Sequence, residues 1–184
     1  MSGGLFGVIR NEHERLLKLV DGALGIVQQK EILSELWQFG EEEHHAREET
    51  LLFSKLLEKD RLREGGPFCV LYFDEHLSNS PGNRVQALLG SEPLWHPRQS
   101  IFKENHSPLN IPLEEHRSMR HLLLFLIQNQ KSMSDQHFRI VFSSYSNILR
   151  HHITKEEKCF FCLCEKLLTA EELVQIEHDW KLSS

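Results

Sequence analysis

Two pairs of residues with metal-ligand chemistry recur in the chain at the same spacing. His44 precedes Glu48 by four residues, and His152 precedes Glu156 by four residues. Residues four apart on a helix lie on one face, about 6 Å apart along the axis, so both side chains of a pair can reach one centre. Imidazole and carboxylate groups bind transition metals. The two pairs predict a metal site, although one such pair alone is more typical of a surface hydrogen bond.

A second repeat adds two histidines to these pairs. In each half of the chain, a histidine flanked by charged residues stands near the start of an amphipathic run: His13 in the first half and His116 in the second. The chain contains 12 histidines, too many for all of them to be ligands. Their placement in the repeat therefore selects the candidate metal ligands. The predicted ligands are His13, His44, Glu48, His116, His152 and Glu156.

Aligning the two halves also chooses between neighbouring histidines. His152 precedes a glutamate by four residues, whereas a lysine stands at that distance from His151. The same alignment favours His44 over His45 and leaves His45 with Glu49 as an open alternative.

Long helices must position these residues. Apolar residues recur at helical spacing in four stretches, at about 6–27, 31–59, 112–130 and 134–168. Pro112 suits a first helical turn, and Ser134 suits an N-cap. Thr169 and Glu172 have the spacing of a capping box that opens a short C-terminal helix. The pattern predicts an all-α fold, in which a bundle of four helices can build a di-metal site from inward-facing pairs.

A connection of about residues 63–110 separates the second and third predicted helices. Glycine and proline interrupt it, and short helices are expected near residues 68–77 and 83–89. So long a connection is unusual in a compact bundle, and two interpretations stay open: a cover for the site, or a contact in a homo-oligomer. It also contains His76, a further candidate ligand.

Composition bounds the class of protein. With 184 residues and 40% hydrophobic residues, the chain is expected to form a single domain over residues 1–184. A net charge of -6 with scattered basic residues argues against nucleic acid or an anionic membrane as a partner. The start lacks the features of a signal peptide, and no segment has the length of a membrane span, so a cytoplasmic location is expected. Cys159, Cys162 and Cys164 are expected to be buried, reduced thiols.

A histidine followed by His-x-x-x-Glu, twice over, resembles the hemerythrin-like, HHE cation-binding superfamily across about residues 6–168. The resemblance implies an up-and-down four-helix bundle, here with a long insertion between helices 2 and 3. It also implies two non-haem iron ions, with the glutamates bridging and the histidines as terminal ligands. Manganese or zinc is compatible with the same ligand types. The family's third-helix histidine corresponds to His116 or to His76, and the context shared with His13 favours His116.

The resemblance implies a protein that binds or senses dioxygen, nitric oxide or peroxide. A di-iron oxidoreductase, or a protein that stores or donates iron during stress, is the alternative, and enzymatic activity stays open. Two octahedral ions offer about twelve coordination positions, of which four histidines and two bridging carboxylates fill about eight. If His76 also binds, fewer coordination positions stay open for an external ligand, which favours storage or sensing over a reaction. A third hypothesis is a helical interaction module that binds no metal.

Overall fold

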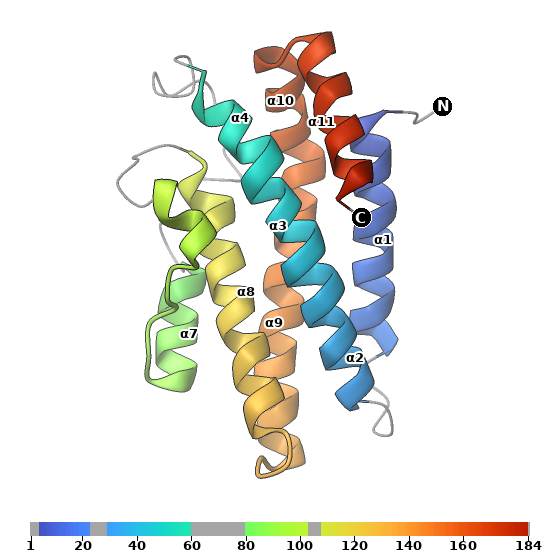
Figure 1. The fold of residues 1–184 in the computed structure, drawn as a ribbon. Helices are drawn as coiled ribbons and strands as arrows, with labels where there is room; N and C mark the ends of the chain where they lie inside the picture. The colour runs from blue at the N-terminus through green and yellow to red at the C-terminus, as the bar shows by residue number, and fades with distance from the viewer. Residues whose placement is uncertain (1–3, 23–28, 60–79, 103–107, 184) are drawn as a thin grey trace.

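The computed structural model describes residues 4–22, 29–59, 80–102 and 108–183. All regular secondary structure in these residues is helical, which confirms the predicted all-α class. Figure 1 shows four long helical stretches running side by side: α1 (Leu5–Gly22), the stretch from α2 to α4, α8 (Asn110–Asn129), and the stretch from α9 to α10. The final helix, α11 (Ala170–Leu182), packs against α1 and against the second stretch.

The second and fourth stretches are continuous helices that contain wider π-type turns. The second consists of α2 (Gln29–Glu35), η1 (Leu36–His44), α3 (His45–Arg47), η2 (Glu48–Phe53) and α4 (Ser54–Leu57). The fourth consists of α9 (Asp135–Lys155), η4 (Glu156–Phe160) and α10 (Phe161–Leu167). Within them, the backbone N–H of His45 donates to the carbonyl of Gly40, and that of Phe161 donates to the carbonyl of Glu156. Such turns are rare and occur frequently at functional sites; here η2 and η4 begin at the two predicted glutamate ligands.

The helix ends agree closely with the sequence signals. Ser134 Oγ accepts a hydrogen bond from the backbone N–H of His137 at 3.3 Å and caps α9. Thr169 and Glu172 form the predicted capping box at the start of α11, with hydrogen bonds of 2.9 and 3.2 Å. The third long helix begins at Asn110, two residues before the expected start at Pro112. Pro112 is thus in the first turn, where its missing N–H leaves no hydrogen bond unmade.

Two elements of the long connection lie against the four long stretches. The helix α7 (Pro81–Leu89) packs against α8 and confirms the short helix expected near residues 83–89. The 3₁₀ segment η3 (Pro97–Phe102) packs against η2. The other expected helix, near residues 68–77, and His76 itself lie outside the described residues.

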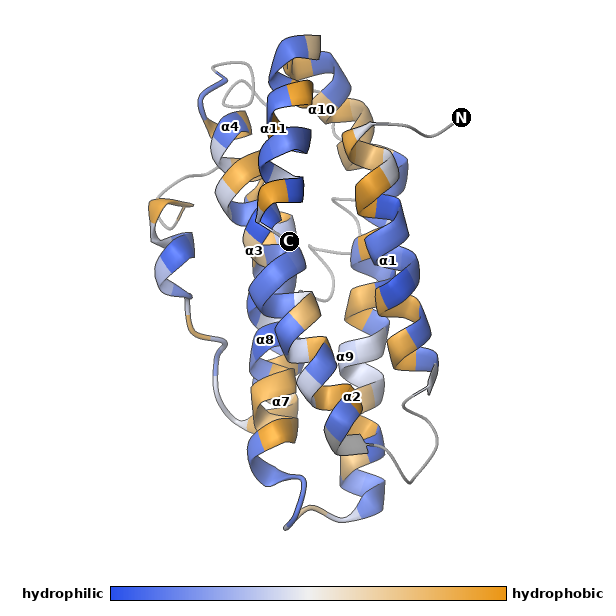
Figure 2. Ribbon diagram, turned by 45° about the vertical axis from the view of Figure 1, so that its right-hand side comes forward, coloured by the Kyte–Doolittle hydropathy of each residue, from blue (hydrophilic) through white to orange (hydrophobic). Residues whose placement is uncertain are grey.

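The buried apolar residues in the described part of the chain form two clusters. Ile9 of α1 belongs to one, with Phe53 and Phe161, whereas Leu16 belongs to the other, with Tyr145. His13 lies between Ile9 and Leu16 along α1 and is itself buried. Figure 2 shows the corresponding alternation of apolar and polar residues along α1. A polar layer therefore separates two apolar layers, which exclude water from it and strengthen its electrostatic interactions.

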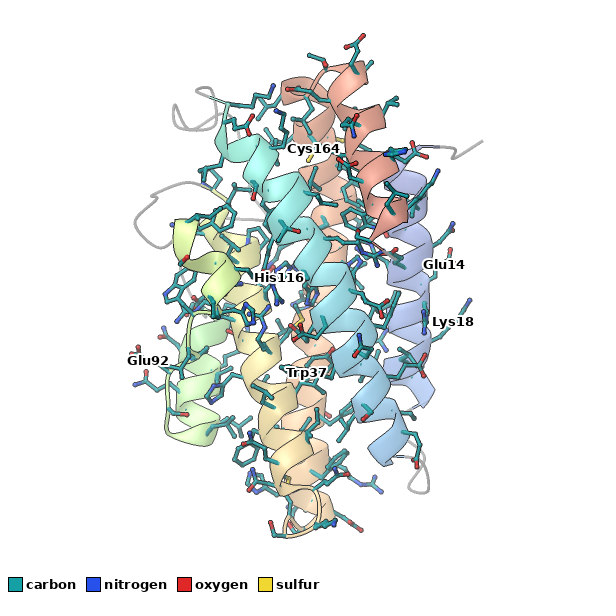
Figure 3. The ribbon with its side chains drawn as sticks, in the orientation of Figure 1. Glu14, Lys18, Trp37, Glu92, His116 and Cys164 are labelled. Carbon is teal, nitrogen blue, oxygen red and sulfur yellow. The ribbon has the colours of Figure 1, made fainter. Side chains whose placement is uncertain are left out.

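Figure 3 shows His116 between Cys164, toward one end of the long helices, and Trp37, toward the other. Cys164 is buried in the first apolar cluster, but Cys162 is exposed. The prediction of buried thiols is therefore wrong for Cys162, because its side chain lies on the solvent-facing side of α10. None of the described helices is long and apolar enough to cross a membrane.

Candidate metal centre

The six described residues predicted as ligands come together in the polar layer. His13 is 1% exposed and the other five are fully buried. Together with His45, these residues form two overlapping groups of donor atoms, and within each group the atoms lie within 4.8 Å of one another. We call these the first position (His13, His44, Glu48 and Glu156) and the second position (His45, Glu48, His116 and His152). Each group could hold a metal ion.

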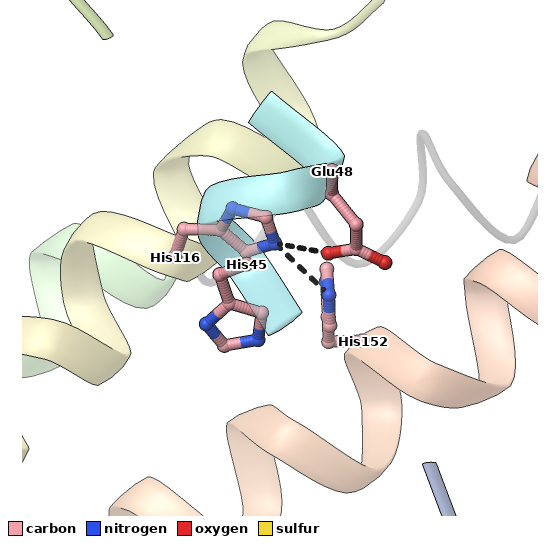
Figure 4. Close-up of side chains that lie close together, drawn as sticks. All are labelled: His45, Glu48, His116 and His152. Atoms are coloured by element: carbon pink, nitrogen blue, oxygen red, sulfur yellow. Dashed lines mark hydrogen bonds and ion pairs between the residues drawn. The ribbon is translucent and has the colours of Figure 1, made fainter. Parts of the chain in front are cut away.

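The two glutamates lie between the positions. Glu48 directs Oε1 toward His44 Nε2, at 3.4 Å, and Oε2 toward His116 Nε2, at 3.3 Å. Glu156 Oε2 is 3.3 Å from both His13 Nε2 and His152 Nε2. Figure 4 shows His116 contacting both Glu48 and His152. Each carboxylate therefore touches ligands of both positions, as a bridging ligand must.

The inward-facing atoms of this site have few partners in the described part of the chain. No hydrogen-bond partner is found for Nε2 of His13, His44 or His45, or for any of the four carboxylate oxygens of Glu48 and Glu156. Buried polar atoms without a partner are costly and uncommon in folded proteins. Bound cations would satisfy all of these atoms at once, so the donor set fits a pair of metal ions.

The outward-facing nitrogens of four histidines each contact a glutamate. The Nδ1 atoms of His13, His44, His116 and His152 lie 2.9, 2.8, 2.9 and 3.0 Å from carboxylate oxygens of Glu157, Glu12, Glu49 and Glu115, respectively. A carboxylate at Nδ1 favours the tautomer in which Nδ1 donates, which leaves the Nε2 lone pair free for a metal. It also fixes the orientation of the ring.

These four outer glutamates form a closed ring around the site. Each is the sequence neighbour of a ligand on its own helix but holds a histidine on the next helix. The first long stretch holds the second through Glu12, the second holds the third through Glu49, the third holds the fourth through Glu115, and the fourth holds the first through Glu157. Sequence reasoning missed this role and considered only Glu49, as a partner of His45. The available signal was a Glu-His pair and a Glu-Glu pair repeated in both halves of the chain.

His45 is a further buried residue of the site. Its ring stacks on that of His116 with centroids 4.1 Å apart, and its Nδ1 lies 3.3 Å from Glu41 Oε1. The structure brings both His44 and His45 to the site, so it adds His45 to the predicted His44. The alternative partner of His45, Glu49, instead contacts His116.

The corresponding histidine in the second half, His151, is exposed, in agreement with the choice of His152. His45 is buried and His151 is exposed because π-type turns lead up to His44, whereas α9 is a regular α-helix through Lys155. A wider turn rotates the chain less per residue, so two consecutive side chains can face the same interior.

Burial and neighbouring charges set the protonation of these groups. Burial lowers the pKa values of His44, His45 and His116 well below the usual range, so these rings are neutral near pH 7 and able to bind metal. Burial, together with the charge of Glu156, raises the pKa of Glu48 well above its usual range. Burial opposes the charged form of Glu156 as well, but the adjacent His152 and His13 outweigh it and lower its pKa.

Basic residues neutralise three of the outer glutamates. Lys155 pairs with Glu115, and Arg47 Nη2 lies 3.1 Å from Glu12 Oε1. Glu49 is paired with Arg98 at 2.5 Å and with Arg120 at 3.4 Å. In the described part of the chain, by contrast, the ion pairs of the inner glutamates, Glu48 and Glu156, are with histidines. Within these residues, no lysine or arginine therefore competes with a bound cation for the oxygens of the inner glutamates.

Comparisons of the chain with protein-family models, with curated proteins and with solved structures gave no significant match. The functional argument therefore depends on the residues and their geometry.

Proposed function

We propose that this protein is a hemerythrin-like, up-and-down four-helix bundle that holds two iron ions and reversibly binds dioxygen or a related small molecule such as nitric oxide. One observation carries the proposal. Seven buried histidine and glutamate side chains direct unpartnered or closely spaced donor atoms toward two positions that share Glu48. The repeated His and His-x-x-x-Glu pattern supports the family, and the long connection between the second and third stretches is an insertion in which this chain departs from the family.

The number of donors favours six-coordinate ions over zinc. Five histidines and two bridging carboxylates supply about nine donor atoms, more than the roughly eight that two tetrahedral ions accept. Two octahedral ions leave about three positions, and a bridging oxygen would take two of them. About one position then remains for an external ligand. Iron and manganese both accept this mixture of nitrogen and oxygen, and the resemblance selects iron.

The uneven distribution of donors indicates where that ligand binds. Two histidines belong to the first position and three to the second, so the open coordination position is expected at the first. Iron, when bound, supplies a redox-active centre for the small molecule. The chain's residues keep the histidines neutral, hold their rings, and exclude water through the two apolar clusters.

The test is metal analysis and absorption spectroscopy of the full chain loaded anaerobically with Fe²⁺. We expect near two iron ions per chain and an absorption spectrum that changes on exposure to oxygen and returns when oxygen is removed. Glu48→Gln and Glu156→Gln should each lose most of the bound iron, because each carboxylate serves both positions. Glu31→Gln, at an exposed site on the same helical stretch, is the matched control and should retain it.

Other outcomes select the other hypotheses. Irreversible oxidation would favour iron storage or donation, and catalytic consumption of peroxide or nitric oxide would favour an oxidoreductase. Wild-type protein without bound transition metal would contradict the proposal. The helical interaction module would then be the remaining hypothesis.

A further inference from the structure

Two elements outside the four long stretches each reach one of the outer glutamates. From α11, the indole Nε1 of Trp180 donates to Glu12 Oε1 at 3.0 Å. From η3, Arg98 Nε donates to Glu49 Oε2 at 2.5 Å, and Gln99 Nε2 donates to Glu49 Oε1 at 2.6 Å. Trp180 and Gln99 are both fully buried. These contacts are therefore part of the interior of the molecule.

The two glutamates serve different positions of the metal centre. The other oxygen of Glu12 contacts His44 Nδ1 at 2.8 Å, and His44 belongs to the first position. Glu49 Oε1 contacts His116 Nδ1 at 2.9 Å, and His116 belongs to the second. Each added element is thus connected, through one carboxylate, to a histidine of one position.

Further contacts hold both elements in place. The Arg47 guanidinium lies 5.1 Å above the Trp180 ring and also contacts Glu12, and the rings of His44 and Trp180 meet edge to face at 6.1 Å. On the other side, Arg98 Nη2 donates to the carbonyl of Glu41 at 2.8 Å. Hydrogen bonds to a carboxylate orient it, and the carboxylate in turn orients the imidazole; removing such a partner typically weakens metal binding about 10- to 100-fold.

We propose that Trp180 is a positioning residue for the first metal position and that Arg98 and Gln99 are positioning residues for the second. The inference rests on the proposed function, since it presupposes that both positions bind metal. It assigns a role to α11 and to η3: each sets the affinity of one ion and leaves the other unchanged.

The experiment is a titration of metal-free, full-length protein with Co²⁺ alone. Calorimetry and the visible absorption of the bound ion monitor the two binding steps. Trp180→Phe keeps an aromatic ring but removes the N–H donor, and Gln99→Leu removes the amide donor at similar volume. We expect each variant to weaken one of the two binding steps about 10-fold and to leave the other step unchanged. Trp95→Phe and the exposed Gln86→Leu are the matched controls and should bind as the wild type does.

Combined variants test which position each residue serves. In a His13→Ala background, which removes a ligand of the first position, Gln99→Leu should still weaken the remaining ion, and Trp180→Phe should not. Because Gln99 acts through Glu49, Gln99→Leu should add little to Glu49→Gln. If Trp180→Phe does not fold, Glu12→Gln tests the same position.

The results that count against the inference are separable from failure of the proposed function. Wild-type protein that binds two Co²⁺ ions, with variants that leave both steps unchanged or weaken both equally, would overturn the inference alone. Wild-type protein that binds no Co²⁺ would overturn the proposed function and the inference with it.

Discussion

The inner and outer glutamates differ in the groups that neutralise them. Glu48 and Glu156 face histidine nitrogens at 3.3 to 3.4 Å, whereas Glu12, Glu49 and Glu115 are paired with arginine or lysine as well as with histidine. Burying a carboxylate without a cation is costly. The inner pair is therefore the part of the centre whose energy depends most on metal.

Replacing Glu48 by Gln should stabilise the metal-free protein, increasingly so as the pH rises. The pKa of Glu48 is raised by burial and by Glu156, so its contribution to stability is present below the ordinary glutamate pKa, about 4.3, and is lost as the pH rises through the raised value. Glutamine does not titrate. Urea unfolding in the presence of chelator, from pH 5 to 8, measures the difference in the free energy of unfolding between Glu48→Gln and the wild type. A difference that becomes smaller as the pH rises would contradict this account.

His45 and His151 provide a direct comparison between the two halves. His45→Ala removes a donor from the second position and should weaken the binding of one Fe²⁺ or Co²⁺ ion by at least about 10-fold, no less than the loss of an orienting partner does. His151→Ala, at the exposed counterpart, should leave metal binding unchanged. Equilibrium metal titration measures the affinities of both variants. Equal effects of the two substitutions would show that the burial of His45 does not make it a ligand.

At the scale of elements, the π-type turns and the added segments shape the centre. The segments η2 and η4 begin at Glu48 and Glu156, the two residues that connect the positions. The final helix depends on its own start signal, because the capping box of Thr169 and Glu172 satisfies two backbone N–H groups. Glu172 is also anchored to the second stretch by Lys59, at 2.6 Å.

Thr169→Ala should therefore destabilise the protein by about 1 kcal/mol, the usual effect of losing an N-cap. Thr154→Ala is the control, since Thr154 is exposed inside the continuous fourth helical stretch, where alanine is the better helix former. Urea unfolding of both variants checks the difference. Equal stabilities of the two variants would mean that α11 contributes little to cooperative unfolding.

At the scale of the molecule, the proposed metal binding would be coupled to folding. The polar layer lies between two apolar clusters, so residues of all four long stretches meet there and every ligand must be held at once. The donors are closely spaced: His116 Nε2 and His152 Nε2 are 3.1 Å apart and share a hydrogen bond. A ligand that binds only the folded state stabilises it by mass action.

Removing the metal should accordingly lower the melting temperature. At a free metal concentration about 100 times the dissociation constant, each ion contributes about 2.7 kcal/mol, so two ions should raise the Tm by roughly 10 °C or more in a chain of this size. Differential scanning calorimetry with Fe²⁺ under anaerobic conditions, and then with chelator, measures the shift. Glu156→Gln should abolish most of it, and a full shift in that variant would contradict the bridging role.

The sequence by itself determined the features that depend on spacing along one helix. Apolar periodicity located the four long stretches, cap residues located the starts of α9 and α11, and the four-residue spacing selected His44 with Glu48 and His152 with Glu156. Each of these signals is local, so a regular helix converts it directly into geometry.

Only the tertiary structure decided the features that depend on how helices are rotated against one another. A π-type turn brings His45 inward while its counterpart His151 stays exposed, and no local pattern distinguishes the two. The outer glutamates hold histidines of neighbouring helices, and Trp180 and Gln99 reach them from elements distant in sequence. These pairings require the relative positions of packed helices, which the periodicity of a single helix does not contain.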